Sequence, residues 1–154
     1  MKTLIIYVSV HHGNTEKIAK VMANILEARL LRPHEMDINT FAEYDLIGYG
    51  SGIYFGKHHK SLLGLVDKLP KSQTKEAFIF YTSGVRKVKF LHECNKLLKK
   101  KLLDKGFDII GEFSCRGFDT FGPFKLIGGI NKGRPNEKDL EQAEIFARGL
   151  RDKS

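Results

Sequence analysis

Short apolar runs alternate along this chain with stretches in which apolar residues recur every three or four positions. The runs are rich in β-branched and aromatic residues, which is typical of strands buried on both faces of a sheet. They lie at residues 4–8, 45–52, 77–81 and 107–115, and a shorter strand is expected within residues 30–36. The pattern therefore predicts five strands, and Pro33, which lacks a backbone donor, leaves the boundaries of the short second strand open.

The stretches with helical spacing predict four helices between and after these strands. They cover residues 15–29, 62–69, 91–102 and 136–150. Pro70 and Gly106 are expected to end the second and third helices. Asn136 is a favourable N-cap with Asp139 three residues later, so the last helix is expected to begin there.

This alternation predicts the α/β class, because strands separated by helices form a parallel sheet covered on both faces. The chain has no repeat and no linker that would divide it, so residues 1–154 are expected to form a single domain. The simplest architecture is a doubly wound, three-layer sandwich with five parallel strands in the order 2-1-3-4-5. In such folds the ligand binds at the carboxyl ends of the strands, beside strand one. The residues that follow strands one, three, four and five are therefore the candidates for a site.

Composition narrows the class of protein. No apolar run approaches the roughly 18 residues that a membrane span requires. The apolar N-terminus is too short for a secretory signal, so we expect a cytoplasmic protein. Cys94 and Cys115 lie far apart and form no CxxC pair, so both are expected to be reduced, small apolar side chains.

The loop after the first strand carries the clearest candidate chemistry. It is rich in hydroxyl and small side chains and leads directly into a helix, whose unpaired N–H groups favour an anion. The hydroxyls of Ser9 and Thr15, the Asn14 amide and the backbone could surround a phosphate, and Gly13 allows close approach. The alternative is a plain turn with an Asn or Thr helix cap. The candidate phosphate-binding residues are Ser9, Val10, His11, His12, Gly13, Asn14 and Thr15.

The order strand–Ser-x-x-x-Gly-Asn-Thr-Glu–helix resembles the phosphate loop of flavodoxins. The match covers residues 9 and 13–16 and departs from the family at His11 and His12, where small or hydroxyl residues are common. The resemblance extends over the whole chain in length, strand order and loop placement. It implies a flavodoxin-like fold, a bound FMN and a role as a low-potential electron carrier.

The resemblance also implies which residues flank the isoalloxazine ring. Tyr54 and Phe55 follow the third strand and are candidates to stack on the ring, although this loop could instead pack on the core. No aromatic residue follows the fourth strand before Phe90, so the connection after strand five is expected to supply a replacement. The candidate ring-flanking residues are Ser51, Gly52, Ile53, Tyr54, Phe55, Gly56, Thr82, Ser83, Gly84, Phe118 and Asp119.

The charge of the chain departs from that of the family. Flavodoxins are typically acidic around the flavin, whereas this chain has a net charge of +8, with eight Lys/Arg between Arg86 and Lys105. A positive surround would stabilise a reduced, anionic flavin and select acidic redox partners. A solvated helix face is the favoured interpretation of the cluster, and a docking surface for an acidic redox protein is the alternative. Nucleic acid is not an expected partner, because no stacking platform accompanies the charge.

Two further interpretations remain open. The first is an FMN-dependent oxidoreductase of the same fold that reduces a quinone or a porphyrin precursor. In that case the long loop from Gly117 to Arg134 would cover the substrate, and residues such as Arg116 and Lys125 would bind its carboxylates. An electron carrier is favoured, and no catalytic residue is assigned. The second is a metal site at the pairs His11-His12 and His58-His59, but contact with phosphate or solvent is the favoured interpretation.

Overall fold

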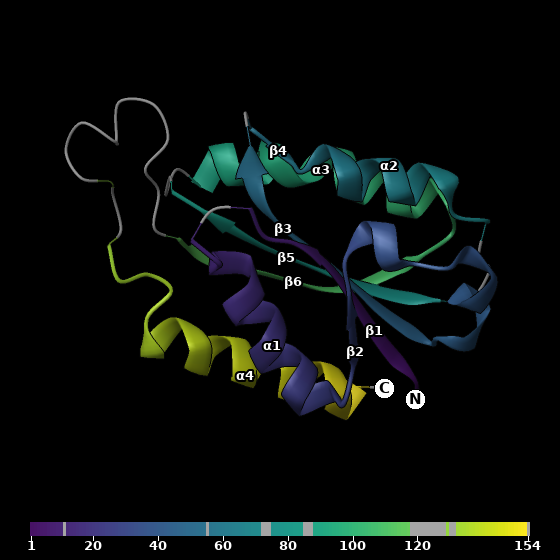
Figure 1. The fold of residues 1–154 in the computed structure, drawn as a ribbon, viewed down its shortest axis with the longest axis horizontal. Coiled ribbons are helices and arrows are strands. Elements are labelled where there is room, and N and C mark those ends of the chain that lie inside the picture. The colour runs from purple at the N-terminus through teal and green to yellow at the C-terminus, as the bar shows by residue number, and fades with distance from the viewer. Residues whose placement is uncertain are drawn as a thin grey trace.

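The computed structural model describes residues 1–10, 12–54, 56–71, 75–84, 88–117, 129 and 132–153, and for residues 88–92 it describes the backbone. The chain folds into three layers, with helices on both faces of a central sheet (Figure 1). Helices α1 (Asn14–Leu26) and α4 (Glu137–Lys153) cover one face, and α2 (Lys60–Lys68) and α3 (Val88–Asp104) cover the other. The predicted α/β sandwich is confirmed.

The sheet has the predicted doubly wound order. Its parallel strands are β1 (Thr3–Val8), β2 (Arg29–Leu31), β3 (Leu46–Tyr54), β5 (Glu76–Ser83) and β6 (Asp108–Arg116), and their order is β2-β1-β3-β5-β6. Counted along the chain, this is 2-1-3-4-5. Strand β3 is flanked by β1 and β5, so the carboxyl ends of these three strands lie together.

The segment after β3 differs from the loop that the sequence predicts. Strand β3 continues to Tyr54 and turns back as the short antiparallel strand β4 (Lys57–His58), in which Ile53 pairs with His58 and Tyr54 with Lys57. A two-residue strand is too short to show a hydrophobic period of its own. It forms because β3 extends beyond its parallel neighbours and offers an edge to pair with.

The second predicted strand is shorter and begins earlier than expected. Strand β2 ends at Leu31, and Pro33 opens the 3-10 helix η1 (Pro33–Glu35), which is followed by η2 (Ile38–Glu43). Proline suits the first position of a helical turn, because its missing N–H would have no partner there. The Arg32 N–H donates to the Glu35 carboxylate at 2.6 Å and holds this turn.

The start of α4 is held by reciprocal hydrogen bonds, as the sequence predicts. The Asn136 N–H donates to Asp139 Oδ2 at 2.8 Å, and the Asp139 N–H donates to Asn136 Oδ1 at 3.0 Å. The Arg134 guanidinium donates to both carboxylate oxygens of Asp139, at 2.5 and 2.6 Å. Burial alone would raise the pKa of Asp139, but these hydrogen bonds hold it below its usual value. The chain that enters α4 is thereby tied to the first turn of the helix.

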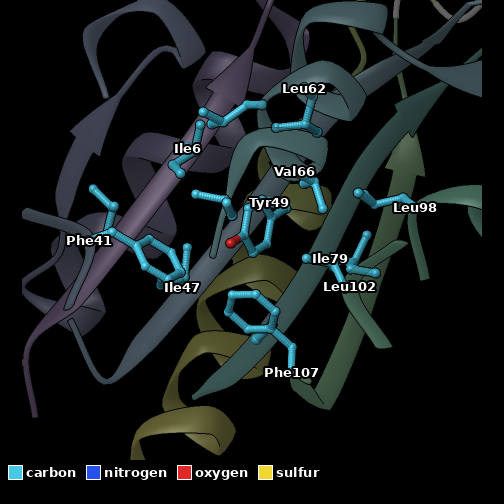
Figure 2. Close-up of a cluster of buried hydrophobic side chains, with 14 of the residues drawn as sticks. Ile6, Phe41, Ile47, Tyr49, Leu62, Val66, Ile79, Leu98, Leu102 and Phe107 are labelled. Atoms are coloured by element: carbon cyan, nitrogen blue, oxygen red, sulfur yellow. The ribbon is translucent and has the colours of Figure 1, made fainter. Parts of the chain in front are cut away.

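Each face of the sheet buries its own hydrophobic cluster. The cluster under α2 and α3 includes Tyr49, which meets Phe107 edge-on with ring centroids 5.9 Å apart (Figure 2). The cluster under α1 and α4 includes Phe78 and Phe80, which stack at 6.1 Å. In the described part of the chain, no helix is long and apolar enough to cross a membrane.

Candidate functional site

The sheet register brings the predicted residues to one edge. Val8, the last residue of β1, pairs with Ser51 of β3, and Gly52 pairs with Thr82 of β5. Ser83 in turn pairs with Arg116 at the end of β6. The segments that follow β1, β3, β5 and β6 therefore begin side by side, at the carboxyl ends of these strands.

The loop between β1 and α1 has a strained backbone. His12 and Gly13 both adopt left-handed conformations, with φ of 56° and 63°. Glycine adopts this conformation without steric cost, but a histidine rarely does, and such outliers cluster at functional sites. Gly13 has no side chain to cap α1, and the hydroxyl of Ser9 accepts the Glu16 N–H at 3.2 Å instead. Ser9 thus retains its own hydroxyl proton as a donor.

Thr15 joins this loop to the end of β5. Its hydroxyl lies 2.9 Å from the hydroxyl of Thr82, and the Thr15 residue is 1% exposed. Neither the spacing nor the resemblance predicted that these two candidate residues touch. Because one hydroxyl donates to the other, the second proton of the pair remains available to a further acceptor.

The start of the connection after β6 packs against the same loop. A Cβ added at Gly117 would lie 2.5 Å from Asn14 Nδ2, so only glycine lets the Asn14 side chain approach this backbone. The Gly117 N–H donates to the carbonyl of Ser83 at 3.1 Å. The end of β5 and the segments that follow β1 and β6 are therefore in contact.

Ser51 faces the protein interior rather than the edge of the sheet. It is fully buried, and its hydroxyl lies 2.8 Å from His58 Nδ1 and accepts the His59 N–H at 3.1 Å. Gly52, Ile53, Tyr54 and Gly56 are half-buried. The Tyr54 ring folds back over Gly52 and meets His59 edge-on at 5.2 Å.

His58 is buried, so the expectation that the His58-His59 pair contacts phosphate or solvent is wrong for this residue. It is 3% exposed, and its ring meets Tyr81 edge-on at 5.5 Å. Its place in β4 directs it inward, whereas His59 caps α2 by accepting the Ser61 N–H at 3.1 Å. Burial lowers the pKa of His58 to about 4, although its hydrogen bond to Asn95 opposes this shift.

A chain of buried polar groups continues from His58 to the surface. His58 Nε2 lies 2.9 Å from Asn95 Oδ1, and Asn95 Nδ2 donates to Glu112 Oε2 at 2.7 Å. Lys99 pairs with the other carboxylate oxygen of Glu112. The sequence analysis did not predict this series of hydrogen bonds. Its one signal was Asn95, a polar residue three positions before Leu98 on the apolar stripe of its helix.

Two lysines at the end of α3 and just after it, Lys101 and Lys105, make contacts within the protein. Lys101 donates to the Asp67 carboxylate at 2.6 Å, and Lys105 donates to the Leu69 carbonyl at 2.8 Å, so both hold α3 against α2. Lys96 and Lys100 are exposed.

Several predicted residues lie outside the described part of the chain, namely His11, Phe55, Arg86, Lys87, Phe118, Asp119 and Lys125.

A family model and similar solved structures both concern flavodoxins. The family model described as a flavodoxin domain matches residues 4–114. An uncharacterized protein of Methanocaldococcus jannaschii is 50% identical over 150 residues, which cover 97% of this chain and 98% of that protein. Among solved structures, oxidised flavodoxin 2 from Bacillus cereus has a TM-score of 0.73 at 20% identity, with full coverage of both chains. A flavodoxin from the domain Archaea has a TM-score of 0.68 at 17% identity and covers 99% of this chain and 98% of its own.

Proposed function

This chain belongs to the flavodoxin domain family, and we propose that it binds one FMN and acts as an electron carrier. The observation that carries the proposal is the junction of Ser9, Thr15 and Thr82 at the N-terminus of α1. It joins a helix N-terminus to hydroxyl donors where β1, β3 and β5 end, which is where doubly wound folds bind ligands. When bound, FMN would supply redox chemistry that the described side chains do not offer.

The hydroxyls at this junction suit a phosphate. Ser9 accepts from the Glu16 N–H and keeps a proton to donate, and Thr82 can donate to Thr15, which then directs its own proton outward. Glu16 lies in the same helical turn, but its charge is balanced by Lys20 at 2.8 Å. The hydrogen bond from Lys20 lowers the pKa of Glu16. A phosphate dianion would therefore meet donors and a neutral pair rather than an isolated carboxylate.

The segments around this junction suit the flavin ring. Gly52, Ile53 and Tyr54 form the end of β3 on one side, and Ser83 at the end of β5 and the following Gly84 lie on the other. The oxidoreductase alternative, with a quinone or porphyrin precursor as substrate, depended on Lys125 and a connection whose residues 118–128 lie outside the described part of the chain. No observation on the described residues favours that alternative, so the proposal is an electron carrier.

The test is an FMN titration of the apoprotein and of its Thr15→Ala variant. We expect FMN to bind the wild type and to bind the variant about 1–3 kcal/mol more weakly, through loss of a charge-assisted hydrogen bond to phosphate. Flavin fluorescence or isothermal calorimetry measures both affinities. Identification of the cofactor retained by the purified protein shows whether it is FMN rather than FAD.

The matched control is Thr15→Ser, which keeps the hydroxyl and is expected to retain most of the affinity. Because Thr15→Ala also removes the hydrogen bond to Thr82, unfolding of both apoproteins is measured in parallel. Equal FMN affinity in all three proteins would reject the phosphate assignment. Absence of FMN binding by the wild type would reject the proposed function itself.

We further propose that the redox partner of this carrier is an acidic protein that docks beside the ring-flanking segment. Exposed Lys57 on β4 and Lys60 at the start of α2 lie next to that segment, and the chain has a net charge of +8. Opposite charges steer encounter, and the effect is screened as salt rises.

Reoxidation of the reduced protein by small charged oxidants tests this local field. With anionic hexacyanoferrate(III), the rate should fall about tenfold from low to high salt, and Lys57→Glu/Lys60→Glu should slow it further at low salt. With cationic hexaamminecobalt(III), the rate should rise with salt instead. Arg148→Glu/Lys153→Glu on α4 is the matched control for net charge. The same salt dependence with both oxidants would contradict the proposal.

A further inference from the structure

Four side chains link the surface at β6 to the hairpin formed by β3 and β4. They form a continuous line of hydrogen bonds, with Lys99 outside it at Glu112. Ser51 and Asn95 are 0% and 2% exposed, so water cannot substitute for either partner. We call this line the buried relay, and its members are Ser51, His58, Asn95 and Glu112.

The outer end of the buried relay determines the orientation of the Asn95 amide. The Glu112 carboxylate, paired with Lys99, only accepts hydrogen bonds, so Asn95 must direct its NH2 group toward Glu112. Asn95 Oδ1 then faces His58 Nε2 at 2.9 Å. An oxygen there requires a donor, so neutral His58 carries its proton on Nε2.

The inner end follows from the same reasoning. With the proton on Nε2, His58 Nδ1 is an acceptor, and the Ser51 hydroxyl donates a hydrogen bond to it at 2.8 Å. The Ser51 oxygen then accepts the His59 N–H at 3.1 Å. The Gly52 carbonyl also lies 2.8 Å from Ser51 Oγ, but a hydroxyl has one proton and cannot donate fully to both acceptors.

The opposite direction of hydrogen bonding along the buried relay is disfavoured, because it would place two acceptor oxygens against each other. If Ser51 donated to Gly52, neutral His58 would donate from Nδ1 to Ser51 and present a lone pair to Asn95. Asn95 would have to turn its amide, which would place its oxygen 2.7 Å from Glu112 Oε2. Two acceptors at that distance repel each other strongly in a buried environment.

We propose that Asn95 and Glu112 are positioning residues for the β3–β4 hairpin, because they fix the tautomer of His58 and through it the direction of the Ser51 hydroxyl. As far as it concerns flavin, this inference rests on the proposed function, in which the hairpin flanks the ring. The hairpin has two paired positions between β3 and β4. A ladder this short contributes little stability by itself, so the side chains at its base hold its backbone.

The first test needs no cofactor. Nitrogen-15 NMR of the imidazoles in the apoprotein at pH 7 distinguishes a protonated Nε2 from a protonated Nδ1. We expect His58 to be the single Nε2–H tautomer in the wild type. Glu112→Gln has nearly the same shape but can present either amide end to Asn95, so both tautomers should become populated.

Glu93→Gln is the matched control, because Glu93 is exposed two residues before Asn95 and its loss changes the net charge equally. It should leave the wild-type tautomer unchanged. A wild-type His58 protonated on Nδ1, or a Glu112→Gln spectrum identical to that of the wild type, would overturn the inference whether or not the protein binds FMN.

The second test uses the FMN-loaded protein. Glu112→Gln should shift the flavin midpoint potential or weaken FMN binding by more than Glu93→Gln does, because the hairpin loses its fixed hydrogen-bond direction as well as a charge. If the tautomers behave as expected but the two variants have equal potentials and affinities, Asn95 and Glu112 do not position the flavin segment. If the wild type binds no FMN, the proposed function fails while the tautomer result stands.

Discussion

Replacing Gly50 with alanine is expected to lower the free energy of unfolding by about 3 kcal/mol or more, at the upper end of what overpacking does to a core. Gly50 pairs with Phe80 of the neighbouring strand, and the Phe80 ring lies directly over the glycine. A Cβ at residue 50 would lie 2.1 Å from Phe80 Cζ. Phe80 is fully buried and stacks on Phe78, so its ring has no free space to move into.

Denaturant unfolding of the apoprotein measures this effect, with Gly149→Ala as the matched control. Gly149 lies in α4, and an added Cβ would meet no atom within 4 Å, so that variant should gain up to about 1 kcal/mol from helix propensity. The double variant Gly50→Ala/Phe80→Leu should be more stable than the sum of its single changes predicts, because the smaller side chain relieves the clash. Additive losses, or a Gly50→Ala variant as stable as the wild type, would show that the ring and the glycine are not in tight contact.

Acid is expected to destabilise the protein through His58 by about 3 kcal/mol between pH 7 and pH 4, at about 1.4 kcal/mol for each pKa unit. The pKa of His58 is lowered from 6.5 to about 4 in the folded protein, so the unfolded chain takes up the proton first. The stability that depends on neutral His58 is therefore complete above about pH 6.5. It is lost as the pH falls toward 4.

Unfolding of the wild type and of His58→Gln is measured across this range. The variant is less stable at pH 7, because it disturbs the buried relay, but its stability should fall less steeply with acid. His34→Gln is the matched control, since His34 is exposed on η1 and should leave the wild-type slope unchanged. Carboxylates that titrate in the same range contribute equally to all three proteins. Parallel curves for wild type and His58→Gln would mean that His58 is not buried in its neutral form.

Much of the fold could be predicted because it depends on local patterns. The apolar runs at residues 4–8 and 77–81 and the spacing from Leu91 to Leu102 predicted strands and helices where the structure has them. Pro70 and Asn136 marked a helix end and a helix start correctly, since a missing N–H and a side-chain cap act on their own turn of backbone. The strand order was then predicted as that of the simplest doubly wound fold with five strands alternating with helices, and the structure has this order.

Local sequence patterns did not predict the elements that depend on what lies beside them in the fold or next along the chain. Strand β4 consists of two residues and forms only because β3 reaches beyond the sheet. Strand β2 ended at Leu31 because the chain begins a 3-10 turn at Pro33, which the strand pattern did not distinguish from an interrupted strand.

The same distinction between local patterns and tertiary contacts applies to the candidate site. By itself, the sequence predicted a candidate phosphate loop at residues 9–16, because these residues are contiguous and the apolar spacing after them indicates a helix N-terminus. Only the tertiary structure decided that Thr15 meets Thr82 and that His58 is buried beside Ser51 and Asn95. Hydrophobic periodicity reports which face of an element is buried. It does not report which polar groups from distant elements meet there, and burial shifts a pKa or fixes a proton only after those partners are in place.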